Sequence, residues 1–190
     1  MSLRSSAAFL AALAAWFLAP PAAHATTMRH LETRDLVVES SEVVIAEVEG
    51  TRSYWNTAHT RILTEVSLHV TRALKGAPGE RVTLTQMGGE VDGVRVTVHG
   101  SPVFRAGEEA LVFVWRDPRG RAQVNGLAQG KFTIRRDPLT GEKVLERSPG
   151  FAPRDAKTLG VTTEGRTASP LSLASLVREI ERVVAKEAGR

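Results

Sequence analysis

Apolar and polar positions alternate along much of this chain, and that is the period expected of β-strands. The alternation is clearest over residues 62–71, where the row predicted to face inward is Ile62, Thr64, Val66, Leu68 and Val70. Residues 43–45 and 110–115 are apolar without alternation, which predicts strands covered on both faces. These three segments predict the centre of a β-sheet.

Shorter runs of the same kind lie between turn-forming residues and predict further strands. These runs are residues 81–87, 94–99 and 142–147, together with a strand around Phe132 and Ile134. The turns are predicted at residues 88–93, 117–120 and 137–141. Val94, Val96 and Val98 are expected to share one face of their strand.

Helical spacing of apolar residues is found near the two ends of the chain. Residues 26–40 predict a short helix, and residues 169–190 predict an amphipathic helix with Ser169 as its cap and Pro170 in its first position. Because an isolated helix of this length is marginal in water, the C-terminal helix is expected to dock on the sheet.

The elements together predict a mainly β fold, a small antiparallel OB-like barrel or sandwich of about six or seven short strands. A short N-terminal helix and a docked amphipathic C-terminal helix complete it. Residues 26–147 are expected to form the OB-like β-barrel domain, residues 148–168 an irregular loop that wraps the barrel, and residues 169–190 the C-terminal helix of the same domain.

The first residues have the pattern of a secretory signal peptide. Arg4 precedes the apolar run of residues 7–19, and Ala23 and Ala25 are small residues suited to a cleavage site before Thr26. The apolar run is shorter than the roughly 20 residues that a spanning helix needs. We therefore expect residues 1–25 to be removed, leaving an exported periplasmic or extracellular protein without a transmembrane segment.

Composition narrows the chemistry further. The chain has no cysteine, which excludes disulfides, thiolate metal sites and cysteine nucleophiles. The formal net charge is +4 at pH 7, and the charges are interspersed, as in an ordinary solvated surface. Basic residues are frequent near the turn at 117–120, where they are interpreted as a solvated face: Arg116, Arg119, Arg121, Lys131, Arg135 and Arg136.

The segment "VHGSPVFRAGEEALVFVW" contains the residues that most resemble catalytic groups. Ser101 lacks both the G-x-S-x-G pattern and a following helix, so it is interpreted as part of a turn. Glu108 and Glu109 are adjacent residues entering a strand, where side chains alternate, and they are expected to face opposite ways. The segment is therefore predicted to be structural.

Histidines supply the candidate metal ligands. His69 and His99 are both predicted on outward-facing strand positions, where they form a possible site with a carboxylate such as Glu65. Solvated histidines on polar faces are the ordinary interpretation of the same pattern. No histidine pair has the spacing of a zinc motif, and no cofactor is expected.

The segment "RSYWN" is the candidate binding site. Tyr54 and Trp55 stand where the first strand gives way to a loop, with Arg52 and Arg61 nearby. Adjacent side chains on a strand point to opposite sides, so one ring is expected to be buried and the other exposed. An exposed ring flanked by arginines suits stacking on a sugar, a base or a partner protein. Packing at the edge of the barrel interior is the ordinary interpretation of the same aromatic pair.

Five segments in this order resemble a group of uncharacterised exported bacterial proteins with a small β-barrel: "SEVVIAEVEG", "ILTEVSLHVTRALKG", "VTLTQMGG", "VHGSPVFRAGEEALVFV" and "NGLAQGKFTI". The short helix, the long hairpin and the "LKG" that ends it also resemble the OB-fold barrel of netrin-like domains and tissue inhibitors of metalloproteinases. That resemblance implies the barrel fold. Those inhibitors chelate zinc through an N-terminal cysteine, whereas Thr26 stands at the predicted N-terminus here.

We therefore expect an exported, non-enzymatic binding or scaffolding module of the cell envelope, whose partner is a protein or an envelope polymer. Two alternatives stay open: a metal-binding protein or hydrolase that uses the histidines, and a protease-inhibitor-like module. Nucleic acid is not an expected partner, because the chain is expected to be exported.

Overall fold

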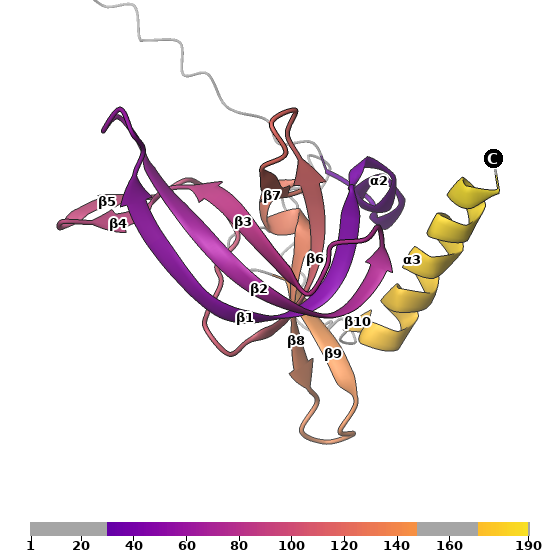
Figure 1. The fold of residues 1–190 in the computed structure, drawn as a ribbon. Helices are drawn as coiled ribbons and strands as arrows, with labels where there is room; N and C mark the ends of the chain where they lie inside the picture. Colours follow the sequence, from indigo (N-terminus) through magenta and orange to yellow (C-terminus); the bar gives the residue numbers. More distant parts are fainter. Residues whose placement is uncertain (1–29, 148–170, 190) are drawn as a thin grey trace, which may run out of the picture.

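The computed structural model describes residues 30–147 and 171–189 and shows a mainly β protein. Within this part of the chain, five strands close a barrel and two α-helices lie beside it (Figure 1). The expected fold class is confirmed. The signal peptide with Ala23, Ala25 and Thr26, the loop at 148–168, and Ser169 and Pro170 lie outside the described residues.

The elements follow one another in this order: α2 (Thr33–Glu39), β1 (Glu42–Trp55), β2 (Ile62–Lys75), β3 (Arg81–Met87), β4 (Gly89–Val91), β5 (Val94–Val96), β6 (Glu109–Arg116), β7 (Ala122–Val124), a 3₁₀ turn (Leu127–Gly130), β8 (Lys131–Arg136), β9 (Lys143–Arg147), β10 (Leu171–Ser172) and α3 (Leu173–Ala188).

The barrel closes because β1 pairs on both of its sides. It runs antiparallel to β2 along most of its length, and its first half also pairs with β6, from Glu42 opposite Val114 to Glu47 opposite Glu109. β3 pairs with β2 on the side away from β1. β7 lies between β3 and β6: it pairs with β3 in parallel, through Leu84 and Ala122, and antiparallel with β6. On its other side, β6 continues the sheet into β8, β9 and β10.

The apolar run of β6 lies between two cores. Ala110, Val112 and Val114 point into the barrel, and Leu111 and Phe113 point to the outer cluster beneath the helices. All five side chains are fully buried. The prediction of a central strand covered on both faces is confirmed, and β1 shows the same double coverage at Val43, Val44 and Ile45.

The alternation predicted for β2 is also confirmed. Ile62, Thr64, Val66 and Leu68 are buried, whereas the residues between them are half-buried or exposed. Val66 and Leu68 belong to the core inside the barrel. Thr64 is the one polar member of the buried positions of this row and lies between Ile62 and Val66.

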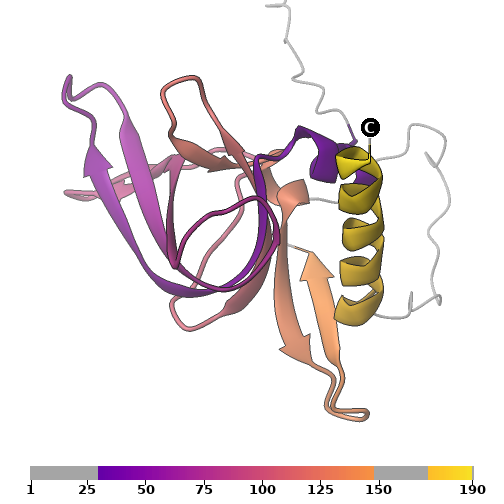
Figure 2. The same ribbon diagram turned by 45° about the vertical axis from the view of Figure 1, so that its right-hand side comes forward.

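The C-terminal helix docks as expected, but it begins later than predicted. Leu176, Val177 and Ile180 are buried in the outer core, and Figure 2 shows α3 lying alongside β8 and β9. The helix begins at Leu173 because Leu171 and Ser172 pair with β9 as strand β10. The described α2, at Thr33–Glu39, lies within the predicted N-terminal helix.

The segment 88–99 differs from the prediction. Residues 89–91 form strand β4, and only Asp92 and Gly93 make the turn, each with a positive φ. This geometry is that of a two-residue hairpin turn, so β5 pairs with β4 in a separate small sheet. Val94 and Val96 are exposed there, and His99 lies in a turn beyond the strand.

Candidate binding site at the hairpin ends

The long β1–β2 hairpin ends in a turn that Asn56 holds together. The Asn56 side-chain oxygen accepts the backbone N–H groups of Thr60 at 2.8 Å and Arg61 at 3.1 Å. The backbone N–H of His59 donates to the carbonyl of Asn56 at 2.8 Å. This local network is typical of an Asn-centred turn, and it fixes the backbone that carries the side chains at the hairpin end.

We name the side chains at this end the tip cluster: Arg52, Tyr54, Trp55, His59 and Arg61. The Trp55 ring stacks on the His59 ring, with centroids 5.9 Å apart and planes 25° from parallel. The Arg52 guanidinium lies 5.5 Å from the centre of the Tyr54 ring, in cation–π geometry. Both rings therefore have an ordered neighbour within the hairpin.

The expectation that one ring is buried and the other exposed is wrong, because Tyr54 and Trp55 are both half-buried. Each ring packs against a polar neighbour of the hairpin and not against an apolar core. Both rings consequently keep surface that an incoming molecule can contact.

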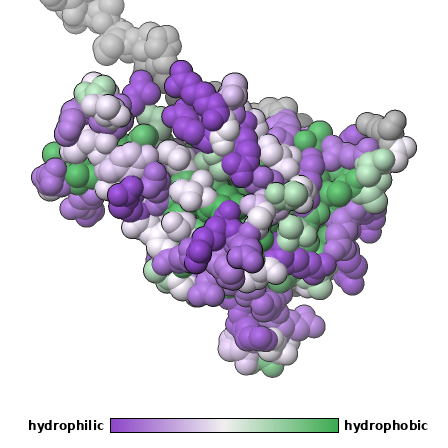
Figure 3. Space-filling model, viewed as in Figure 1, coloured by the Kyte–Doolittle hydropathy of each residue, from purple (hydrophilic) through white to green (hydrophobic). Residues whose placement is uncertain are grey.

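A second hairpin brings positive charge to the same region. The pKa of the Tyr54 hydroxyl lies above its usual value because of partial burial and then because of the nearby Glu65 carboxylate, while Arg52 and Arg121 act in the opposite direction. Arg121 belongs to the β6–β7 turn, so this turn adds its charge to the field around Tyr54. Figure 3 shows hydrophilic residues gathered at the hairpin ends.

Asp117 organises the β6–β7 turn. One of its carboxylate oxygens accepts the backbone N–H groups of Arg119 and Arg121 at 2.9 and 3.0 Å, and the other accepts the Arg121 side chain at 2.7 Å. The turn predicted at 117–120 is confirmed by the bond from Gly120 N–H to the Asp117 carbonyl. Asp117 thus fixes the backbone from which Arg119 projects.

The ends of the β1–β2 and β6–β7 hairpins carry four arginines, Arg52, Arg61, Arg119 and Arg121, and two of these have no partner among the described residues. Arg52 pairs with Glu65 at 3.0 Å and Arg121 pairs with Asp117. Among the described residues, the guanidinium groups of Arg61 and Arg119 have no hydrogen bond or ion pair. These two groups can bind an anion without first giving up an internal partner.

The segment around Ser101 is a connection without catalytic geometry. The Ser101 backbone N–H donates to the Val98 carbonyl at 3.2 Å, and its hydroxyl has no hydrogen bond to a histidine or carboxylate of the described residues. Glu108 and Glu109 pair with different strands, Glu108 with Lys131 of β8 and Glu109 with Lys143 of β9. They do not act on one another.

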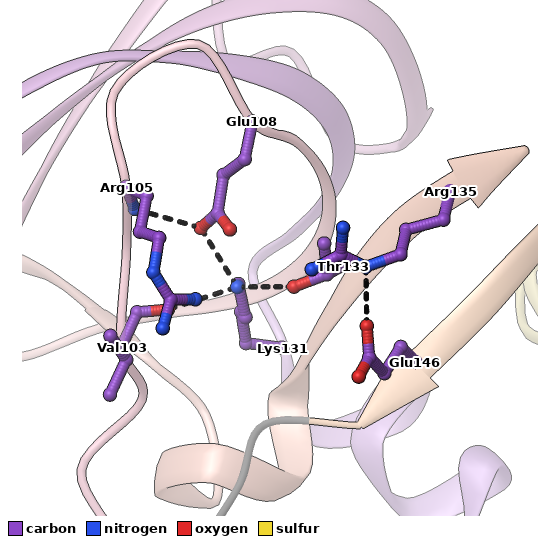
Figure 4. A network of polar contacts seen from close by, with 7 residues as sticks. All are labelled: Val103, Arg105, Glu108, Lys131, Thr133, Arg135 and Glu146. Atoms are coloured by element: carbon purple, nitrogen blue, oxygen red, sulfur yellow. Dashed lines mark hydrogen bonds and ion pairs between the residues drawn. The ribbon is translucent and has the colours of Figure 1, made fainter.

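Lys131 was interpreted from the sequence as part of a solvated basic face, and that interpretation is wrong. Its side chain is 1% exposed. Its ammonium group pairs with Glu108 at 2.8 Å and donates to Thr133 Oγ1 at 2.7 Å and to the Val103 carbonyl at 2.9 Å (Figure 4). Burial lowers the pKa of Lys131, and Glu108 opposes that shift. Through Glu108 and Val103, the Lys131 ammonium group holds the connection between β5 and β6 against β8.

The candidate metal ligands occupy separate positions. His69 is exposed on β2, opposite Glu47 of β1 and Arg81 of β3. Glu65 faces Arg52, and His99 lies in the turn after β5. In the part of the chain that the structure describes, no three or more histidine, aspartate or glutamate side chains form a group that could hold a metal.

Neither described helix has the length and apolar character needed to cross a membrane. The sequence matches no protein-family model and no curated protein.

Proposed function

We propose that this protein is an exported, non-enzymatic binding module that recognises an anionic polymer of the cell envelope, such as a polysaccharide bearing carboxylate or phosphate groups. The observation that carries the proposal is that two half-buried rings at the end of the β1–β2 hairpin share that end with the unpaired guanidinium group of Arg61, while the β6–β7 turn carries a second unpaired guanidinium group, that of Arg119. Aromatic faces suit the apolar face of a sugar, and guanidinium groups suit carboxylates and phosphates.

The barrel supports the same proposal through its strand order. The strands β1, β2, β3, β7 and β6 succeed one another around the barrel, and β6 returns to β1. We take this to be an OB-like barrel, in which the connections between the first and second strands and between the fourth and fifth strands commonly bind oligosaccharides and oligonucleotides. The corresponding connections here are the β1–β2 and β6–β7 turns.

The proposed export of the chain limits the ligands that it can meet. The signal peptide proposed for residues 1–25 directs the mature chain to the envelope or beyond, where polysaccharides are abundant. Cell fractionation followed by N-terminal sequencing tests this part, and Thr26 is the expected first residue. Recovery of the uncut chain from the cytoplasm would contradict it.

The binding proposal is tested by co-sedimentation of the purified protein with isolated, insoluble envelope polysaccharide at several salt concentrations. A charge-assisted hydrogen bond contributes about 1.5–3 kcal/mol. Arg61→Ala should therefore weaken binding about tenfold or more. Trp55→Ala should weaken binding at every salt concentration, because stacking does not depend on charge.

Arg135→Ala is the matched control, because Arg135 is an exposed arginine of β8 that already pairs with Glu146. It should bind as the unchanged protein does. If Arg61→Ala and Arg135→Ala lower binding equally, the tip cluster is not the site. Retention of the protein by envelope proteins after enzymatic removal of the polysaccharide would contradict the polymer and favour a protein partner.

A further inference from the structure

The barrel has a cavity of about 440 Å³ at its mouth, separate from the tip cluster. Its wall comes from β1, β2, the end of β3, the β4–β5 hairpin and the connection at residues 97–104. The mouths of β-barrels are frequent sites of small-molecule binding, in cavities of about 300–1,000 Å³ lined by apolar groups with a few polar ones.

The floor of this mouth is polar but already satisfied. The Thr64 hydroxyl donates to the Gly88 carbonyl at 2.7 Å and shares a hydrogen bond of 2.8 Å with the Ser53 hydroxyl. Gly89 packs so closely here that a Cβ atom on it would lie 2.3 Å from the Ser53 hydroxyl oxygen. These contacts form a closed backing for the cavity.

Gln86 is different. It lies at the end of β3 and lines the cavity, and its side-chain oxygen is buried without a hydrogen-bond partner among the described residues. Buried polar atoms in native proteins almost always have a partner, and each exception requires an explanation. The Gln86 side chain is half-buried, but its oxygen is closed off from the cavity in this structure. A donor on a bound molecule would provide the missing partner once the amide group turns about its last torsion.

The rest of the wall indicates the remaining chemistry of that molecule. Met87, Val96 and Val103 line the cavity and leave 52%, 41% and 43% of their surface exposed, so the opening is apolar. The charged side chains of the lining are Glu90 and Arg95, which pair with one another at 2.8 Å through the arginine Nε. The wall therefore offers no unpaired charge to an ionic ligand.

We propose that the barrel mouth is a second binding site, for an uncharged ligand with an apolar body and an N–H or O–H group that donates to the Gln86 side-chain oxygen. The site is independent of the polymer-binding tip cluster. Its ligand class also differs, because the tip cluster presents the unpaired cation of Arg61 and the mouth presents an apolar wall without an unpaired charge.

A series of related fluorescent probes tests the proposal. N-phenyl-1-naphthylamine is uncharged and has one N–H group. Its N-methyl derivative lacks the donor, and 1-anilinonaphthalene-8-sulfonate adds a negative charge to the same rings. The unchanged protein should bind the first probe saturably, at one molecule per chain. The methylated probe should bind about three- to tenfold more weakly, the ratio that one hydrogen bond supplies, and the sulfonate should bind more weakly still.

Gln86→Leu should remove the preference for the N–H probe over the methylated one. Comparing the two probes in the same variant cancels the general increase in apolarity that leucine brings. Gln123→Leu is the matched control, because Gln123 of β7 lines the adjoining smaller pocket but not this cavity, and this variant should keep the preference. The binding variant Trp55→Ala/Arg61→Ala should also keep it, so failure of the tip-cluster proposal and failure of this one are distinguishable.

A second variant keeps the test decisive if Gln86→Leu fails to fold. Thr97 is exposed and lines the cavity, so Thr97→Phe should fill its opening at little cost and abolish probe binding. Absence of saturable binding in the unchanged protein would overturn the proposal. So would equal affinity for the methylated and unmethylated probes, tighter binding of the sulfonate, or unchanged binding in Thr97→Phe.

Discussion

The ion pair between Lys131 and Glu108 provides the sharpest test of how this fold is held together. Both side chains are buried, with 1% and 11% of their surface exposed. Replacing Glu108 with glutamine keeps the shape of the side chain and removes its charge. The Lys131 ammonium would then keep a carbonyl and a hydroxyl as acceptors, but no countercharge. Breaking a buried pair in this way costs about 3–5 kcal/mol of unfolding free energy.

The cost should depend on pH in a defined direction. Burial already holds the pKa of Lys131 below its ordinary value, and Glu108 is the largest influence that opposes this shift. Loss of Glu108 lowers the pKa of Lys131 in the folded state further. At pH values below that pKa, the buried ammonium group without a countercharge lowers the unfolding free energy of the variant. Above the ordinary lysine pKa of about 10.4 the amine is neutral in both the folded and unfolded states. The deficit of Glu108→Gln should therefore shrink as the pH rises from 7 toward 10.

Equilibrium urea unfolding, followed by tryptophan fluorescence at pH 7 and pH 10, measures both effects. Glu109→Gln is the matched control, because Glu109 is the next residue and pairs with Lys143 in a much more exposed position. Surface pairs of this kind contribute about 0–1 kcal/mol. A loss for Glu108→Gln at pH 7 no larger than that of Glu109→Gln would refute the argument. A deficit that does not change with pH would show that charge is not its cause.

Four further substitutions probe other parts of the fold, all by urea unfolding. Phe113→Ala should cost about 3–5 kcal/mol, because its fully buried ring fills the outer core, and a loss below 1 kcal/mol would contradict that packing. Ile180→Ala should cost about 2–5 kcal/mol, because α3 is docked through this buried residue. Gly89→Ala should cost about 1–3 kcal/mol, because its φ is +130° and the new methyl group would collide with Ser53. Gly50→Ala, with open space around it and no positive φ, should be almost neutral.

The parts of the fold that could be predicted are those in which the local pattern alone determines burial. The unbroken apolar run at 110–114 can be buried only on two faces, and alternation over 62–68 identifies one inward row. The position of Tyr54 and Trp55 at the end of the first strand is confirmed, because β1 ends at Trp55. The predicted orientation of these two rings is wrong, because the polar neighbours His59 and Arg52 replace the apolar core that alternation assumes.

The parts that were missed depend on partners distant in sequence. Lys131 looks like a surface residue beside Arg135, and nothing local shows that Glu108 lies within 2.8 Å of it. The sequence does not reveal the unpaired oxygen of Gln86 either. Alternation along a strand predicts the face on which a side chain lies, but not whether its polar atoms have a partner. Such features require the closed barrel and cannot be derived from periodicity.

In the described part of the chain, the residues that stabilise the fold lie apart from the surfaces proposed to bind ligands. The outer core, α2 and α3 gather at one side of the molecule, and the tips of β1–β2 and β4–β5 extend at the other (Figure 1). Between them the inward row of β2 is apolar at Leu68, Val66 and Ile62 and is interrupted by the hydroxyl group of Thr64, which lines the mouth. Valine at position 64 would lose the hydrogen bonds that Thr64 makes to Ser53 and Gly88, and it would leave a buried carbonyl unpaired. Among the described residues, Gln86 is the one whose side chain has a buried polar atom without a hydrogen-bond partner, so the binding proposed at the mouth depends on Gln86.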